Sequence, residues 1–117
     1  VWTGRSLSGD FDVDHAIPFS LRHDNSLWNL FPADSRINNR KRDKLPTRNL
    51  VEKSRDILMH YWEIMNEHLH EIFVSDFRRF TGLPALPAEN WKHPLYWSFT
   101  EALETTAARR GAERWEP

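Results

Sequence analysis

The hydrophobic pattern of this chain changes its period once, and that change limits the possible folds more than any other feature of the sequence. Residues 11–15 alternate between apolar and polar side chains, which is the period of a half-buried β-strand. From about residue 47 onwards, apolar residues recur at intervals of three and four, which is the period of an amphipathic helix. The sequence therefore predicts an α+β chain in which short strands precede helices.

Prolines and polar runs divide the first part into short elements. We expect a strand, a loop and a second strand, over residues 11–15, 18–26 and 27–31. Pro32 closes the second strand. Asp34 or Ser35 then offers an N-cap oxygen for a helix that runs to about Lys44 and stops before Pro46.

The second part carries a long apolar stripe. Its members are Leu50, Ile57, Leu58, Tyr61, Trp62, Met65, Leu69, Ile72, Phe73, Phe77 and Phe80. They predict a long amphipathic helix to about Thr81, with room for one break. Glycine and proline between residues 82 and 87 interrupt it, and a last helix is expected from about His93 to Arg110. We expect the aromatic side chains, including Trp97, to form the core rather than to bind a ligand.

The composition excludes several classes of protein. No stretch is apolar for long enough to cross a bilayer and no signal-peptide pattern opens the chain, so we expect no membrane contact. The absence of cysteine excludes disulfides, thiolate catalysis and cysteine-bound zinc, and it fits the cytoplasmic location that we expect. Because the sequence starts at Val1, we expect a segment of a longer protein with other domains. No pattern indicates an oligomeric state.

Basic side chains cluster just before the change of period. Residues 1–48 carry eight basic and six acidic side chains, whereas residues 49–117 carry eight and eleven. Within residues 36–48 only Asp43 opposes the basic set Arg36, Arg40, Lys41, Arg42, Lys44 and Arg48. Such a patch can bind phosphates. A solvated helix face is an equally good interpretation of a charge run by itself.

Four polar residues in this part suit the hydrolysis of a phosphodiester, which requires an activated water, a cation and groups that hold the phosphate. Asp14 offers hard oxygen ligands for Mg²⁺ or Mn²⁺. His15 has the near-neutral pKa of a general base. Asn38 could add an amide oxygen, and Lys41, one helical turn further, could reach a phosphate. Each of these residues taken singly is more often an ordinary surface or helix residue.

Three blocks of sequence carry these residues in a fixed order. They are DHAIPFS at residues 14–20, WNLFPAD at residues 28–34 and INNRKRDKLP at residues 37–46. Together they resemble the HNH endonuclease family, in a His-Asn-Asn version, over about residues 1–48. The resemblance implies a ββα-metal fold, which is a short two-stranded antiparallel hairpin plus a helix. Residues 49–117 would then be a helical extension packed on this core within one structural domain.

The resemblance also implies a role for each matching position. Asp14 and Asn38 would bind one divalent ion, Mg²⁺, Mn²⁺ or another, and Asn38 stands where many members have histidine. His15 would be the general base, and Asn29 would hold the loop after the first strand by hydrogen bonds. Lys41 would contact a substrate phosphate. Further contacts to nucleic acid would come from Arg36, Arg40, Arg42, Lys44 and Arg48.

The sequence departs from the family pattern in one respect. Many members carry two cysteine pairs that bind a structural zinc ion, and Thr3, Asp34 and Ile37 stand where such cysteines are expected. We therefore expect no structural zinc, and we expect hydrophobic packing to replace it. The candidates for this packing are Trp2, Leu7, Phe11, Trp28 and Ile37.

Two functions follow from these observations. The first is a metal-dependent endonuclease domain that hydrolyses DNA, with RNA as the other possible substrate and His15 activating water. The alternative is a non-catalytic nucleic-acid-binding or protein-interaction module that keeps the ββα shape. The presence of Asp14, His15 and Asn38 together favours the nuclease, because a degenerate module would be expected to have lost at least one of them.

Overall fold

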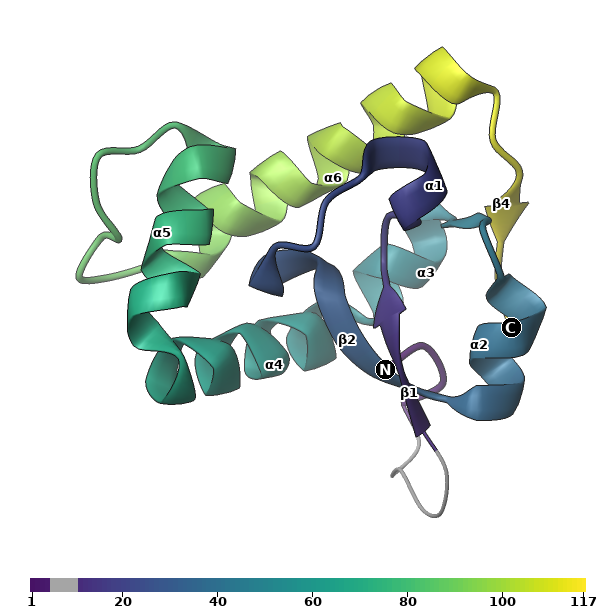
Figure 1. The fold of residues 1–117 in the computed structure, drawn as a ribbon, viewed down its shortest axis with the longest axis horizontal. Coiled ribbons are helices and arrows are strands. Elements are labelled where there is room, and N and C mark those ends of the chain that lie inside the picture. The colour runs from purple at the N-terminus through teal and green to yellow at the C-terminus, as the bar shows by residue number, and fades with distance from the viewer. Residues whose placement is uncertain (5–10) are drawn as a thin grey trace.

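A computed structural model describes residues 1–4 and 11–117 of the chain, and its long helices follow a first part made of short elements (Figure 1). The first elements are β1 (Phe11–His15), α1 (Phe19–Arg22), the 3₁₀ helix η1 (Leu27–Asn29), β2 (Leu30–Asp34), α2 (Ser35–Lys41) and β3 (Leu45–Pro46). The later elements are α3 (Arg48–Lys53), α4 (Arg55–His68), α5 (His70–Thr81), α6 (Lys92–Arg110) and β4 (Arg114–Trp115).

A β-hairpin followed directly by a helix forms the first part of the fold. Strands β1 and β2 pair antiparallel, with Asp14 opposite Phe31 and His15 opposite Leu30. Helix α2 begins at once after β2, because the Asp34 carboxylate accepts hydrogen bonds from the backbone N–H groups of Arg36 and Ile37. The expected first strand and the expected N-cap at Asp34 are therefore confirmed, and the chain is a mixture of helix and strand.

The second strand starts three residues later than the sequence predicts. Residues 27–29 instead form η1, in which the Asn29 N–H donates to the Ser26 carbonyl at 2.9 Å. Pro32 lies within β2, opposite Val13, rather than closing it. A two-stranded sheet tolerates this proline because each strand has an edge that needs no hydrogen-bond donor.

Two further short elements differ from the prediction. Residues 19–22 form α1 inside the expected loop. Helix α2 ends at Lys41 rather than near Lys44, because Arg42 adopts a left-handed φ of 50°. The chain then enters β3, which pairs in parallel with β4 near the C-terminus. Strands of two residues are too short to show the alternating pattern by which a strand is predicted from sequence.

The long amphipathic stripe forms three helices, with breaks at Ser54 and Leu69, rather than one helix with room for one break. The second break folds α5 back toward η1. There the Asp76 carboxylate accepts a hydrogen bond from the Leu27 N–H at 2.9 Å, and the ring of Phe80 stacks on Trp28 with centroids 3.7 Å apart. Helix α6 occupies the range expected for the last helix, starting one residue earlier.

One hydrophobic core joins the hairpin to the later helices. The ring of Phe31 on β2 lies 6.3 Å from Trp62 on α4 and 6.3 Å from Phe99 on α6, between centroids. The aromatic stripes therefore form the core as expected, with Phe73 and Phe77 also fully buried. Trp97 is an exception because its side chain is 64% exposed.

The residues whose packing was expected to replace a zinc ion differ in how deeply they are buried. Trp2 and Trp28 are buried, and Ile37 is partly buried against the core. Phe11 is 55% exposed, so the prediction was wrong for this residue. It neighbours Asp12, whose side chain contacts α2, so strand alternation directs Phe11 to the opposite face of β1. Leu7 lies outside the described residues.

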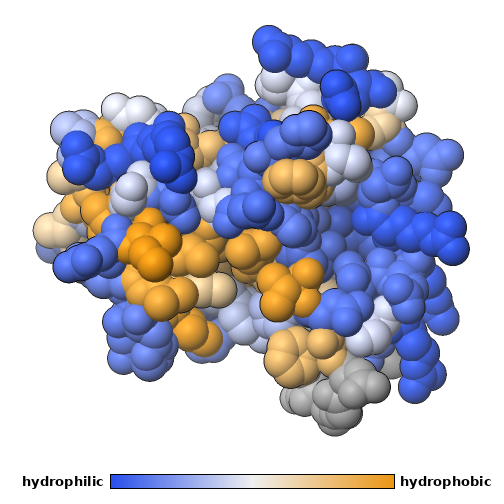
Figure 2. Space-filling model, in the orientation of Figure 1, coloured by the Kyte–Doolittle hydropathy of each residue, from blue (hydrophilic) through white to orange (hydrophobic). Residues whose placement is uncertain are grey.

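The surface divides into two regions in the orientation of Figure 1. Figure 2 shows hydrophobic side chains gathered where α4 and α5 lie, a region that includes the exposed Leu69 and Ile72. The opposite side, toward α2, is predominantly hydrophilic (Figure 2). Over the described part of the chain, none of the helices combines the length and apolarity needed to span a membrane.

Candidate active site

The end of β1 and the middle of α2 border one open cleft of about 270 Å³. Asp14 and His15 come from the strand, and Asn38 comes from the helix. The other residues that line it are Val13, Pro18, Phe19, Ser20, Arg42 and Asp43. The hairpin and α2 thus bring together three of the site residues that are widely separated in the sequence.

Asp14 is held from the inside of the molecule. Its side chain is only 5% exposed. One carboxylate oxygen accepts a hydrogen bond from Trp2 Nε1 at 2.8 Å, and the other lies 3.3 Å from Lys41 Nζ. The carboxylate therefore has a fixed orientation at the border of the cleft.

Lys41, which the sequence suggested as a phosphate contact, has a buried side chain in the structure. Its side chain is 0% exposed, and its ammonium group donates both to Asp14 and to the His15 carbonyl, the latter at 2.9 Å. Burial lowers the pKa of Lys41 from its usual value, although the neighbouring Asp14 acts in the opposite direction. The side chain points inward because the inner face of α2 packs on the hairpin, so it can stabilise Asp14 but has no surface to offer a substrate.

His15 stands at the end of β1, half-buried, with both a polar and an aromatic neighbour. Its Nε2 atom lies 2.6 Å from the side-chain oxygen of Asn25. Its ring centroid lies 5.8 Å from that of Phe19. In the tautomer in which Nε2 donates to Asn25, Nδ1 carries the lone pair that a base requires.

Asn29 fixes the loop that follows His15. It is fully buried, and its amide oxygen accepts from the Ile17 N–H at 2.8 Å. Its amide nitrogen donates to the carbonyls of Ile17 and Asp24, both at 3.0 Å. The backbone carbonyl of Asn29 also accepts from the Ala16 N–H. The residues directly after His15 are therefore held on both sides by one asparagine.

Asn38 is held by a residue that the sequence did not single out. Its amide nitrogen donates to Asp12 Oδ2 at 3.0 Å, and Ser35 Oγ donates to the other Asp12 oxygen at 3.3 Å. Strand alternation could have indicated Asp12, because it lies two residues before Asp14 and so on the same face of β1. Asn25 had no such signal, because it lies in an irregular loop.

These residues fit a small, hard cation. Asp14 supplies carboxylate oxygens with lone pairs beyond those used by Trp2 and Lys41, and Asn38 supplies an amide oxygen. The described residues include no group of three or more His, Asp or Glu side chains that could hold a metal ion. An ion at this cleft could take ligands from Asp14 and Asn38, with water and substrate oxygens completing its shell.

The five basic residues expected to bind nucleic acid lie on α2, directly after it and at the start of α3. Arg42 lines the cleft, whereas Arg40 and Arg48 line two other cavities. Arg36 is exposed near the start of the helix. Lys44 is half-buried and lies 3.7 Å from Glu113. Among these five residues, Arg42 is thus the one placed at the cleft itself.

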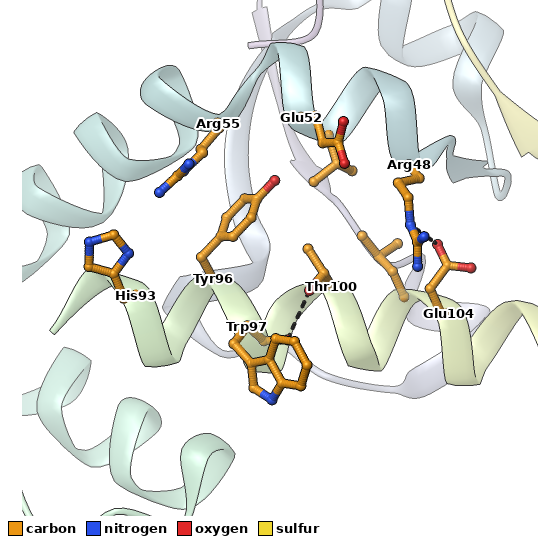
Figure 3. Close-up of a pocket in the computed structure, with 10 residues that line it drawn as sticks. Arg48, Glu52, Arg55, His93, Tyr96, Trp97, Thr100 and Glu104 are labelled. Atoms are coloured by element: carbon orange, nitrogen blue, oxygen red, sulfur yellow. Dashed lines mark hydrogen bonds and ion pairs between the residues drawn. The ribbon is translucent and has the colours of Figure 1, made fainter. Parts of the chain in front are cut away.

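A larger cavity, of about 600 Å³, lies between α3, the start of α4 and α6 (Figure 3). Arg55 lies over the ring of Tyr96 at 5.2 Å, and Arg48 lies 4.0 Å from Glu104. The buried Tyr96 hydroxyl has no hydrogen-bond partner within the described residues, and burial raises its pKa. None of the cleft residues Asp14, His15 and Asn38 lines this cavity.

Comparison with known protein families gives a match in the first part of the chain. Residues 4–47 match the family model described as HNH endonuclease. No curated protein and no solved structure matches the chain. The matched segment contains every residue that lines the cleft and ends before α3. That family description indicates a nuclease-type function, with nucleic acid as the substrate, for the matched segment. Residues 4–47, which are 44 of the 117 residues, are thus similar to the HNH endonuclease family.

Proposed function

We propose that this chain is a metal-dependent endonuclease domain that hydrolyses DNA phosphodiester bonds at the cleft between β1 and α2. The convergence of Asp14, His15 and Asn38 on that cleft, inside the segment that matches the family, carries the proposal. In this proposal β1, β2 and α2 are the ββα-metal unit. Residues 49–117 are a helical extension that shares its core.

His15 is the proposed general base. Asn25 accepts from its Nε2 atom, so Nδ1 is the nitrogen that takes a proton from the attacking water. Asn29 holds the backbone of residues 16 and 17, and Lys41 holds the carbonyl of His15. The imidazole thus projects from a backbone that hydrogen bonds fix on both sides, as a positioned base requires.

Asp14 and Asn38 are the proposed ligands of one Mg²⁺ or Mn²⁺ ion. When bound, the ion would offset the negative charge that develops on the phosphate during hydrolysis. Trp2 and Lys41 orient the Asp14 carboxylate from the protein side. Arg42, at the same cleft, and the exposed Arg36 and Arg40 of α2 contact backbone phosphates, which position the strand without reading its sequence.

Cleavage of supercoiled plasmid tests the proposal. The wild-type chain should nick the plasmid with Mg²⁺ or Mn²⁺ and should stop when EDTA is added. His15→Ala should lower the rate by about 10²- to 10⁴-fold, because this is the usual contribution of a general base. His60→Ala is the matched control, since His60 is exposed on α4 and does not line the cleft, and it should cut like the wild type.

The same assay separates the alternatives. Cleavage by His15→Ala at the wild-type rate would exclude His15 as the base. DNA binding without metal-dependent cleavage, in every metal tried, would favour a non-catalytic module. Faster cleavage of an RNA of matched length would reassign the substrate and leave the site unchanged.

A further inference from the structure

Asp12 contacts the candidate site without lining its cleft. It is half-buried on β1, and its carboxylate lies between two residues of α2. Asn38 Nδ2 donates to one of its oxygens at 3.0 Å, and Ser35 Oγ donates to the other at 3.3 Å. Both oxygens of Asp12 therefore accept hydrogen bonds from the helix that carries Asn38.

Only one orientation of the Asn38 amide pairs favourably with the Asp12 carboxylate. The two ends of an asparagine amide have nearly the same shape, but one end is an acceptor and the other a donor. An ionised carboxylate can only accept. Asp12 therefore binds the nitrogen end of Asn38, and a flipped amide would place two oxygens against each other and leave the carboxylate without that donor.

We propose that Asp12 is a positioning residue that selects which end of the Asn38 amide is presented to the cleft. The inference rests on the proposed function, because it concerns the atom that Asn38 offers to a cation. An amide oxygen can bind a divalent ion, whereas an amide N–H₂ group cannot. Asp12 thus turns an asparagine, which could present either end, into an oxygen ligand without itself touching the ion or the substrate.

The first experiment measures the binding of Mn²⁺ alone to the full 117-residue chain by electron paramagnetic resonance. Asp12→Asn keeps the size of the side chain but allows it to donate to the Asn38 oxygen, so both orientations of the Asn38 amide become acceptable. We expect the affinity for Mn²⁺ to fall by about 10- to 100-fold, which is the usual effect of removing a residue that orients a metal ligand. Unchanged affinity in a folded Asp12→Asn variant overturns the proposal.

A double variant separates positioning from structural support. In Asn38→Asp both ends of the side chain are oxygens, so no orientation needs to be selected. Adding Asp12→Asn to this background should lower the Mn²⁺ affinity much less than it does in the wild type, since only the attraction of one nearby negative charge is lost and no amide can be misoriented. A purely structural role for Asp12 predicts an equal loss in both backgrounds, which would contradict the proposal.

A spectroscopic measurement on the wild-type chain keeps the proposal testable even if Asp12→Asn does not fold. In heteronuclear NMR spectra, one Asn38 side-chain amide proton should be shifted downfield and exchange slowly with water. The neighbouring Asn39, which is exposed, is the internal control. If the two amides behave alike, Asp12 does not hold Asn38.

Asn38→Ala distinguishes the two levels of inference. If Asn38→Ala binds Mn²⁺ like the wild type, the proposed ligand pair is wrong and the role of Asp12 fails with it. If Asn38→Ala loses Mn²⁺ but Asp12→Asn keeps it, the proposed site stands and only the positioning role is wrong. Urea unfolding of each variant confirms that the protein compared is folded.

Discussion

At the scale of residues, the site is organised by a buried set of polar contacts behind the cleft. Asp14 lies between Trp2 and Lys41, and all three side chains are buried. Burying an ion pair is costly, but leaving one of its charges alone inside the protein costs more. Lys41 therefore supports the carboxylate that the cleft needs, which is a different role from the phosphate contact expected of a basic helix residue.

Lys41→Met tests this role through stability. The variant leaves the Asp14 carboxylate buried without its cation, so we expect the free energy of unfolding to fall by about 3–5 kcal/mol. Urea unfolding followed by tryptophan fluorescence measures it. Arg40→Met, an exposed position on the same helix, should change stability by less than about 0.5 kcal/mol. Equal losses of unfolding free energy for the two substitutions would show that Lys41 does not stabilise the buried Asp14 carboxylate.

At the scale of elements, contacts from distant parts of the chain hold the short segments around the site. Trp62 on α4 donates to the Trp28 carbonyl at 2.9 Å, and Asp76 on α5 accepts from Leu27. Both contacts fix η1, which carries Asn29. The break at Leu69 is what brings α5 to η1. Apolar spacing continues through this break in the sequence, so periodicity alone could not locate it.

The contact between α6 and β4 should make stability depend on acid. Arg114 donates two hydrogen bonds to Glu104 and holds the pKa of that carboxyl below its usual value of 4.5. Because the folded pKa is the lower one, this contribution is present above about pH 4.5 and is lost as the pH falls through the folded pKa.

Glu104→Gln should therefore weaken the fall in stability below about pH 4.5, measured as the difference in unfolding free energy from the wild type across an acid series. Glu101→Gln, exposed on the same helix, provides the control for the loss of one carboxylate. A wild type and a Glu104→Gln variant whose acid profiles run parallel would show that the ion pair adds no stability.

At the scale of the whole molecule, the described part of the segment that matches the HNH family shares one hydrophobic core with the later helices. The faces of Trp28 and Phe31 are covered by Trp62, Phe80 and Phe99, all from beyond residue 48. A chain without cysteine cannot stabilise so short a unit with a zinc ion bound by cysteines. The helices supply the buried area instead.

Truncation after Thr47 should accordingly give an unfolded or aggregating fragment, because it would expose these two aromatic side chains to water. Circular dichroism with thermal melting checks the result. A cooperative melt of the fragment would mean that residues 1–47 fold independently. In the full chain, Trp97→Ala should melt like the wild type, since that side chain is 64% exposed.

The sequence by itself indicated the α+β character, the first strand, the N-cap at Asp34, the last helix and three of the residues that line the cleft, namely Asp14, His15 and Asn38. These features depend on local periodicity, on capping and on ordered blocks of side chains, which a single chain displays directly. It did not determine the start of β2, the breaks at Ser54 and Leu69, or the pairing of β3 with β4.

Only the tertiary structure decided which polar groups near the cleft face water and which face one another. Asp12 and Lys41 carry charges that would by themselves be expected at the surface, yet each contacts a partner more than twenty residues away in the sequence. The physical reason is that the cost of burying a charge depends on the partner it meets. That partner is known only after β1 and α2 have packed together.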